Sequence, residues 1–147
     1  MASRNDLKKI ALRRFKSADQ LIKVSDWDGA SLMMGLSLEC ALKAVTCKTL
    51  GLDNYPETRK VKSINNFFKT HNFDELLVVS GTDSIFGIRG SGYPAWNWAE
   101  FMTQYEGDWW NMKYDLNKIK SWDEDKTKKI YTHLKGLLDE IKVRKLW

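Results

Sequence analysis

The sequence predicts an all-α fold: a bundle of four to six helices with an up-and-down core, formed by residues 1–147 as a single domain. Three observations support this prediction. Apolar residues recur every three or four positions near both ends of the chain, no segment alternates as a β-strand does, and glycines gather in one short stretch. A chain of 147 residues, 43% of them hydrophobic, is also long enough to bury one core.

The first helix is expected from about residue 4 to residue 23. Ser3 and Asp6 resemble a capping box at its start. Its apolar face follows the helical repeat and comprises Leu7, Ile10, Ala11, Phe15, Ala18, Leu21 and Ile22. The opposite face is basic, either solvated or turned toward a ligand, and carries Lys8, Lys9, Arg13, Lys16 and Lys23.

A second, more apolar helix is expected over residues 28–50. Cys40 and Cys47 lie two turns apart on it, too far for a disulfide, and are expected to pack in the core. No apolar run reaches the roughly 18 residues that a membrane span requires, and the N-terminus lacks a secretory signal. We therefore expect a cytoplasmic protein with no membrane association.

Shorter elements should follow. Residues 59–70 are expected to form a short helix or a structured loop, and FDELLVVS another short helix. Residues 81–92 hold four glycines without the pattern of a phosphate-binding loop, so a flexible connector or lid is expected there. The aromatic-rich residues 95–119 should form two helical segments interrupted at Gly107.

The last helix is expected to begin with a capping box of Ser121 and Glu124. Its apolar stripe comprises Ile130, Leu134, Leu137, Leu138 and Ile141.

The net charge of +5 is unevenly distributed. Residues 1–70 carry 13 basic and 7 acidic side chains, residues 71–115 carry 2 and 7, and residues 116–147 carry 9 and 5. Basic ends are compatible with RNA or an acidic partner, or with an ordinary solvated surface. The candidate nucleic-acid contacts are Lys8, Lys9, Arg13, Lys16, Lys128 and Lys129.

Two charges interrupt the second helix. Glu39 precedes Lys43 by four residues, the order that favours a helical ion pair. We expect a partly exposed pair that sets the helix register. The alternative is a buried pair retained to specify the fold or to bind a ligand, since a buried pair is costly unless it is fully hydrogen-bonded.

Three segments resemble HEPN domains, the higher eukaryotes and prokaryotes nucleotide-binding domains. WDGASLMMGLSLECALKAV resembles the second helix of that family, with its Glu-x-x-Leu-Lys-Ala pattern at residues 39–44. THNFDELL, with His71, resembles its Thr-His-Asp/Asn-Leu-x-x-Leu segment, and WWNMKYD, with Lys113, resembles its Trp-to-Arg-Tyr segment. The three segments follow the family's order across residues 27–115.

The resemblance implies a HEPN-like bundle that acts as a binding or partner module. Such a module would form a homodimer and associate with RNA, a nucleotide or a nucleotidyltransferase-type protein, in a bacterial toxin–antitoxin or defence system. We call Glu39, Lys43, His71 and Lys113 the polar seam, because the bundle would bring them together between helices to organise the core or bind a ligand. No metal or cofactor is expected, since no metal-ligand spacing occurs.

One alternative is an enzyme. HEPN ribonucleases carry an arginine, four to six further residues and then a histidine. Here the arginine's place is taken by residues 64–66 before His71 and by residues 126–128 before His133. A metal-independent endoribonuclease would have to use His71 or His133 with Lys128 in the arginine's place, without the bidentate guanidinium contact. Otherwise both histidines are structural, and the lysines are a solvated cluster.

A further alternative is a protein–protein adaptor. Trp96, Trp98, Trp109 and Trp110 lie close together in the acidic part of the sequence, which disfavours stacking on nucleic-acid bases. An aromatic core layer or a Trp-rich protein interface is the expected role of this cluster.

Overall fold

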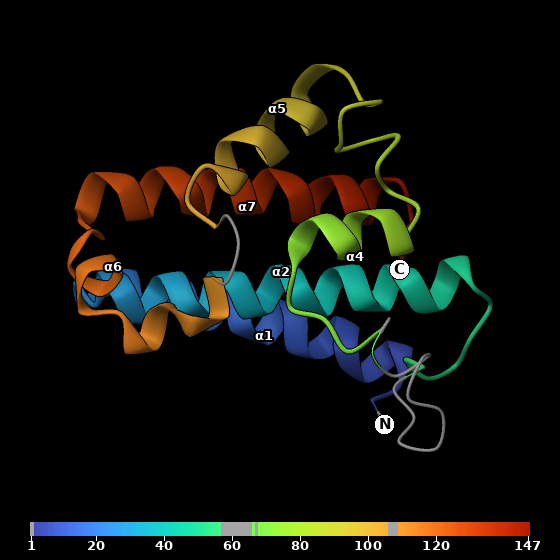
Figure 1. Cartoon of the computed structure of the whole chain (residues 1–147), viewed down its shortest axis with the longest axis horizontal. Coiled ribbons are helices and arrows are strands. Elements are labelled where there is room, and N and C mark those ends of the chain that lie inside the picture. Colours follow the sequence, from blue (N-terminus) through green and yellow to red (C-terminus); the bar gives the residue numbers. More distant parts are fainter. Residues whose placement is uncertain (1, 57–65, 67, 106–108) are drawn as a thin grey trace.

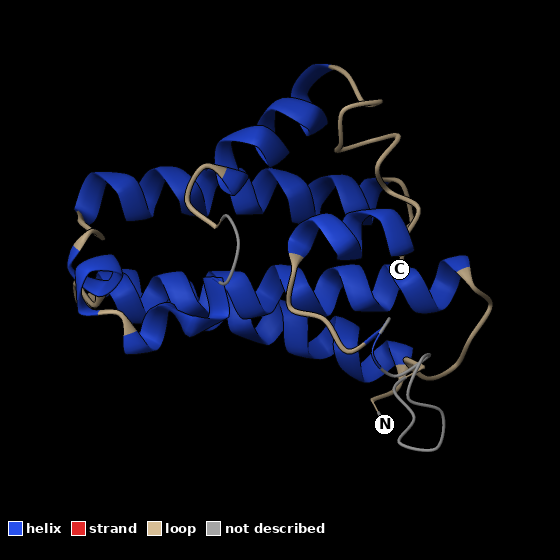
Figure 2. Cartoon of the chain, viewed as in Figure 1, coloured by secondary structure: helices blue, strands red, loops and turns tan. Residues whose placement is uncertain are grey.

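The structure is a computed structural model that describes residues 2–56, 66, 68–105 and 109–147 (Figure 1). In these residues every regular element is a helix, and the one β-type contact is an isolated bridge between Ser3 and Asn54 (Figure 2). The all-α prediction is therefore confirmed for the described residues. In chain order the elements are α1 (Arg4–Lys23), α2 (Trp27–Thr49), α4 (Phe73–Val79), α5 (Gly92–Met102), the 3-10 helix η1 (Trp109–Tyr114), α6 (Leu116–Lys120) and α7 (Glu124–Val143).

α1 begins at a capped end and packs lengthwise against α2, to which it is antiparallel (Figure 1). Ser3 accepts a hydrogen bond from the Asp6 amide at 3.0 Å, as the sequence predicts for an N-cap. Ala11 and Ala18 are fully buried, and their small side chains allow the two helices to approach closely. At this contact the Ser37 hydroxyl of α2 donates to the Ala11 carbonyl at 2.8 Å.

α2 is the central helix, in contact with α1, α4, η1 and α7. By length and composition it could cross a membrane, with a mean hydropathy of 1.3 over its most apolar window, which the sequence analysis did not expect. Within the fold, however, 78% of that window is buried. The apolar character of α2 is thus matched by the helices packed around it.

α7 lies beside α1 and α2 and runs in the same direction as α2 (Figure 1). Phe15 of α1 stacks on Tyr131 of α7 with ring centroids 4.6 Å apart. The up-and-down order therefore holds between α1 and its two long neighbours, whereas α2 and α7 are parallel. The apolar stripe predicted for this helix is buried throughout: Ile130, Leu134, Leu137, Leu138 and Ile141.

The aromatic segment is divided between core and surface. Trp98 and Trp109 are buried, and Trp109 stacks on Phe73 of α4 with ring centroids 5.0 Å apart. Trp96 and Trp110 are 50% and 38% exposed. The expected aromatic core layer is present, and it leaves two indole rings accessible at the surface.

The cap predicted at Ser121 for the last helix is wrong. α7 begins at Glu124, and its N-cap is Asp123, which accepts from the Lys126 amide at 2.8 Å. Ser121 instead closes α6 as its C-cap. The end of α6 and the start of α7 lie close together in the sequence. Trp122 lies between them and is buried in the core, where it is 6% exposed.

The glycine-rich connector and Ile10 of the predicted apolar face can also be compared with their expected positions. The glycine-rich connector is a series of turns, in which Arg89 donates to Asp83 through Nε at 3.0 Å and Nη2 at 2.6 Å. Ile10 of the predicted apolar face is 37% exposed. Most of the segment expected at residues 59–70, and Gly107, lie outside the described residues.

Candidate functional site

The site begins with a buried ion pair on α2. Lys43 Nζ lies 3.0 Å from Glu39 Oε1, and the two residues are 8% and 5% exposed. The expectation of a partly exposed pair is therefore wrong. Helices cover α2 on several sides, so its charged positions also face neighbours. Lys43 Nζ lies 5.0 Å from the centre of the Tyr55 ring as well, which adds a cation–π contact.

His71, which is partly exposed, contacts the Glu39 carboxylate of this buried ion pair. Its Nδ1 lies 2.9 Å and 3.0 Å from the two carboxylate oxygens of Glu39. A carboxylate only accepts hydrogen bonds, so Nδ1 carries the proton in this contact and Nε2 lies on the free edge of the ring. The His71 side chain is 37% exposed, in contrast to 7% for that of Glu39. A buried acid thus fixes the orientation of an accessible imidazole.

The backbone around His71 is held on both sides. Trp109 Nε1 donates to the His71 carbonyl at 2.6 Å, which ties this segment to η1. The next residue, Asn72, is the N-cap of α4 and accepts from the Glu75 amide at 3.1 Å. The imidazole is therefore positioned by a core tryptophan and by a helix start, as well as by Glu39.

Trp110 and Lys113 border the imidazole on the surface. The Trp110 ring stacks on the His71 ring with centroids 4.4 Å apart, and Lys113 Nζ lies 5.3 Å from the centre of the Trp110 ring. The structure thus gathers the polar seam, with Lys113 joined to it through Trp110. Sequence reasoning missed Trp110 as a site residue. Its signal was the spacing of Trp110 and Lys113, since residues three apart share one side of a 3-10 helix.

His133, the other catalytic candidate, lies inside the fold and is 3% exposed. Its Nδ1 lies 2.9 Å from Asn97 Oδ1, and the Trp96 ring packs edge-on at a centroid distance of 4.7 Å. Burial lowers the pKa of His133, while the charge of Glu100 acts in the opposite direction. An RNA phosphate cannot reach this side chain in the observed conformation, so the structure gives His133 a packing role.

The candidate nucleic-acid contacts differ in their exposure and in whether an acid neutralises them. Lys128 of α7 is 2.5 Å from Glu124, and Lys129 is 3.6 Å from Glu100, so both are neutralised locally. Lys8 is half-buried beside Trp147. Three of the candidates on α1 are exposed and have no carboxylate within 4 Å among the described residues: Lys9, Arg13 and Lys16.

The described residues contain no group of three or more His, Cys, Asp or Glu side chains that could hold a metal ion. Both cysteines are free thiols. Burial, reinforced by the charge of Glu39, raises the pKa of Cys40 to about 11, so it is protonated at neutral pH. We therefore do not assign either cysteine as a nucleophile at the polar seam.

The arrangement of His71, Trp110 and Lys113 is chemically suited to binding an anion. An imidazole held by a carboxylate can donate from Nε2 when it is protonated and accept a proton there when it is neutral. Trp110 adds an aromatic surface beside the imidazole, and Lys113 adds a positive charge next to the Trp110 ring.

No family model, curated protein or solved structure matches this chain, so the HEPN resemblance rests on the three sequence segments alone.

Proposed function

We propose that this chain is a HEPN-like binding module that contacts an RNA phosphate through His71 and Lys113. The observation that supports the proposal most strongly is the contact of His71 Nδ1 with the buried Glu39 carboxylate. This contact fixes the ring and leaves Nε2 for a ligand. Lys113 lies next to the Trp110 ring, where it would contact a neighbouring part of the same ligand.

The surroundings favour a polyanion over a lone ion. The exposed cations of α1 supply positive charge beyond the polar seam, and phosphate contacts dominate the affinity of proteins for nucleic acids. The HEPN resemblance extends the proposal to a homodimer that works with a nucleotidyltransferase-type partner in bacterial toxin–antitoxin or defence systems.

The test is electrophoresis of a labelled RNA pool with the full chain in EDTA. We expect a mobility shift in the parent that weakens in His71→Gln and Lys113→Gln, because each variant removes a side chain that would contact the RNA. Lys135→Gln is the matched control, since Lys135 is already paired with Asp139 at 2.7 Å. Thermal unfolding of each variant separates lost binding from lost folding. Parent-like RNA binding by both seam variants would contradict the proposal.

A second candidate is a metal-independent endoribonuclease, favoured by the same Glu39–His71 contact. The carboxylate would stabilise a proton on Nδ1 while Nε2 takes the proton of a ribose 2′-hydroxyl. The 2′-oxygen would then bond to phosphorus as the bond to the 5′-oxygen breaks, and the departing oxygen would take a proton from solvent.

This candidate is tested on the same gel. It requires RNA fragments with 2′,3′-cyclic phosphate ends that form in EDTA and disappear in His71→Gln. If His71 is the catalytic histidine, a His133→Gln variant that folds should cleave RNA as the parent does. Intact RNA in every lane would exclude the ribonuclease and leave the binding module.

A further inference from the structure

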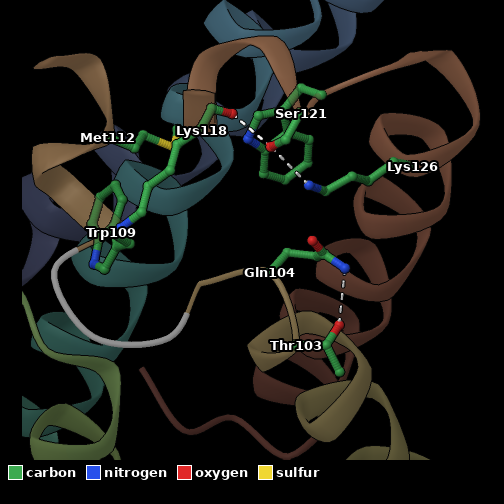
Figure 3. A pocket seen from close by; sticks show the side chains of 8 residues that line it. Thr103, Gln104, Trp109, Met112, Lys118, Ser121 and Lys126 are labelled. Atoms are coloured by element: carbon green, nitrogen blue, oxygen red, sulfur yellow. Dashed lines mark hydrogen bonds between the residues drawn. The ribbon is translucent and has the colours of Figure 1, made fainter. Parts of the chain in front are cut away.

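A cavity of about 190 Å³ lies at the corner where α5, η1, α6 and α7 meet (Figure 3). Its floor is apolar and consists of Trp109, Met112 and Trp122, which are 2%, 5% and 6% exposed. Its polar lining includes Lys118 and Lys126. We call this the corner cavity. It combines a buried aromatic surface with two positive charges.

In the part of the chain that the structure describes, the charged side chains that line the corner cavity are Lys118 and Lys126. Among the described residues, neither Lys118 nor Lys126 has a carboxylate within 4 Å. On α7, in contrast, Lys128, Lys129 and Lys135 each pair with an acid. The corner cavity therefore holds two lysines whose charge is unpaired within the described residues.

Lys126 lines the corner cavity and extends toward Ser121 (Figure 3). Its Nζ lies 4.5 Å from the centre of the Trp122 ring and 3.2 Å from the Ser121 hydroxyl oxygen. Burial lowers the pKa of Lys126, while the charge of Asp123 acts in the opposite direction. An ammonium group that has lost part of its hydration would gain from contact with an anion.

We propose that the corner cavity binds a small organic anion, whose phosphate or carboxylate group contacts Lys118 and Lys126 and whose apolar body packs against Trp109 and Trp122. The volume is below the roughly 300 Å³ at which pockets for drug-sized ligands begin, which limits the ligand to about one ring with its charged group. Aromatic floors with a few placed polar groups are typical of such sites.

The corner cavity is separate from the polar seam, and its ligand does not depend on RNA binding. Residues of η1 serve both places. Trp109 and Met112 line the corner cavity, whereas Trp110 and Lys113 adjoin His71. Trp109 also donates to the His71 carbonyl. The two activities are therefore separated by replacing other side chains: Lys118 and Lys126 for the corner cavity, and His71 and Lys113 for the polar seam.

The test is NMR of the full chain labelled with ¹⁵N in its seven tryptophans. Phenyl phosphate, benzoate and inorganic phosphate are titrated separately, with phenol as the uncharged probe. We expect saturable shifts of the indole signals of Trp109 and Trp122, assigned through single Trp→Phe variants. Phenyl phosphate binding more tightly than benzoate would identify a phosphate ligand, and the reverse order a carboxylate ligand.

Lys118→Gln and Lys126→Gln should each weaken binding about tenfold, because each removes a charge-assisted contact. Lys128→Gln on the same helix is the matched control and should bind as the parent does. Indole signals that match the parent in the absence of probe verify the fold of each variant. The proposal is overturned if no anionic probe produces a saturable shift, if phenol binds equally well, or if the Lys118→Gln/Lys126→Gln double variant binds like the parent.

Discussion

Glu39 both stabilises the core and orients a histidine at the surface. Its carboxylate lies within a helix surrounded by others, yet it contacts one buried cation and one accessible imidazole. The free energy of ionising a buried acid is recovered only if its partners stay in place. The orientation of His71 is therefore maintained by the same contact that stabilises α2.

Glu39→Gln should lower the free energy of unfolding by about 3 kcal/mol, because it removes a buried negative charge that contacts both the Lys43 ammonium and His71. Glu124→Gln is the matched control: it removes an exposed pair of the same i, i+4 spacing and should cost less than about 1 kcal/mol. Urea unfolding followed by circular dichroism measures both. Equal losses in the two variants would show that burial does not distinguish the pairs.

His133 should make the protein less stable as the pH falls below about 6.5. Burial keeps the pKa of His133 below this usual value in the folded chain, so the unfolded chain binds a proton first. The free energy of unfolding then decreases by at most about 1.4 kcal/mol for each pH unit between the two pKa values. Nearby Glu100 and Lys129 carry opposite charges and act in opposite directions on this pKa.

Urea unfolding at several pH values, for the parent and for His133→Gln, measures this effect. The variant should show a smaller loss of stability between about pH 7.5 and pH 5.5, since it lacks the titrating group. Identical pH dependence in both proteins would mean that His133 binds its proton equally well in the folded and unfolded chains.

Residue by residue, the sequence predicted the membership of the polar seam better than its environment. Three of its members make direct contacts, and Lys113 lies beyond Trp110. The burial of Glu39 was missed because helical spacing shows which residues share a face of a helix, and cannot show how many other helices cover it. The spacing of Trp110 and Lys113 indicates that they share one side of a helix, but the stacking of Trp110 on His71 is a tertiary contact that this spacing does not show.

At the level of elements, the contact between α2 and η1 depends on a glycine. A Cβ at Gly35 would lie 2.3 Å from the Trp109 ring, which is buried against α2. The same ring donates to the His71 carbonyl and lines the corner cavity. Gly35 therefore allows η1 to lie close enough to serve both places.

Gly35→Ala should destabilise the protein by about 1 to 2 kcal/mol. Alanine favours the helix by up to about 1 kcal/mol, but overpacking against a buried ring costs about 1 to 3 kcal/mol. Chemical unfolding provides the measurement, and Trp109→Phe provides the control, because it removes the ring atoms that the new methyl group would meet. The alanine should cost less in that background. Stabilisation by Gly35→Ala in the parent would contradict the close packing.

The helices with long apolar repeats, the short α4 and the cap at Ser3 were predictable, whereas the cap of α7 was not. The bounds of α1 and α2 lie close to those predicted from periodicity. The start of α7 was misplaced because Ser121 and Asp123 are both good capping residues and local sequence does not choose between them. The choice follows from the burial of Trp122, which is a property of the whole fold.

On the scale of the whole molecule, the two basic ends of the chain become neighbours. The stacking of Phe15 on Tyr131 and the contact of Lys8 with Trp147 bring α1 and α7 together. Sequence alone could show that both helices are basic, but not that they adjoin. Local acids neutralise part of α7, so the exposed cations of α1 are the better candidates for contacting a polyanion.

Replacing Lys9, Arg13 and Lys16 together by glutamine should therefore reduce the salt dependence of RNA binding. Each lost phosphate contact lowers the slope of log affinity against log salt by about 0.7 for single-stranded RNA. Fluorescence anisotropy at several salt concentrations measures the slope. The control variant, Lys128→Gln together with Lys135→Gln, changes charges that are already paired and should leave it nearly unchanged. An unaltered slope in the α1 variant would place RNA elsewhere.

The packing of Trp109 against Gly35 also has an evolutionary consequence. A side chain at position 35 and an indole at position 109 cannot both occupy the present space, so the two positions should covary among relatives of this chain. Relatives with a larger residue at position 35 should carry a smaller one at position 109. They would also lose the indole N–H that holds the His71 carbonyl, and should therefore diverge at position 71 as well.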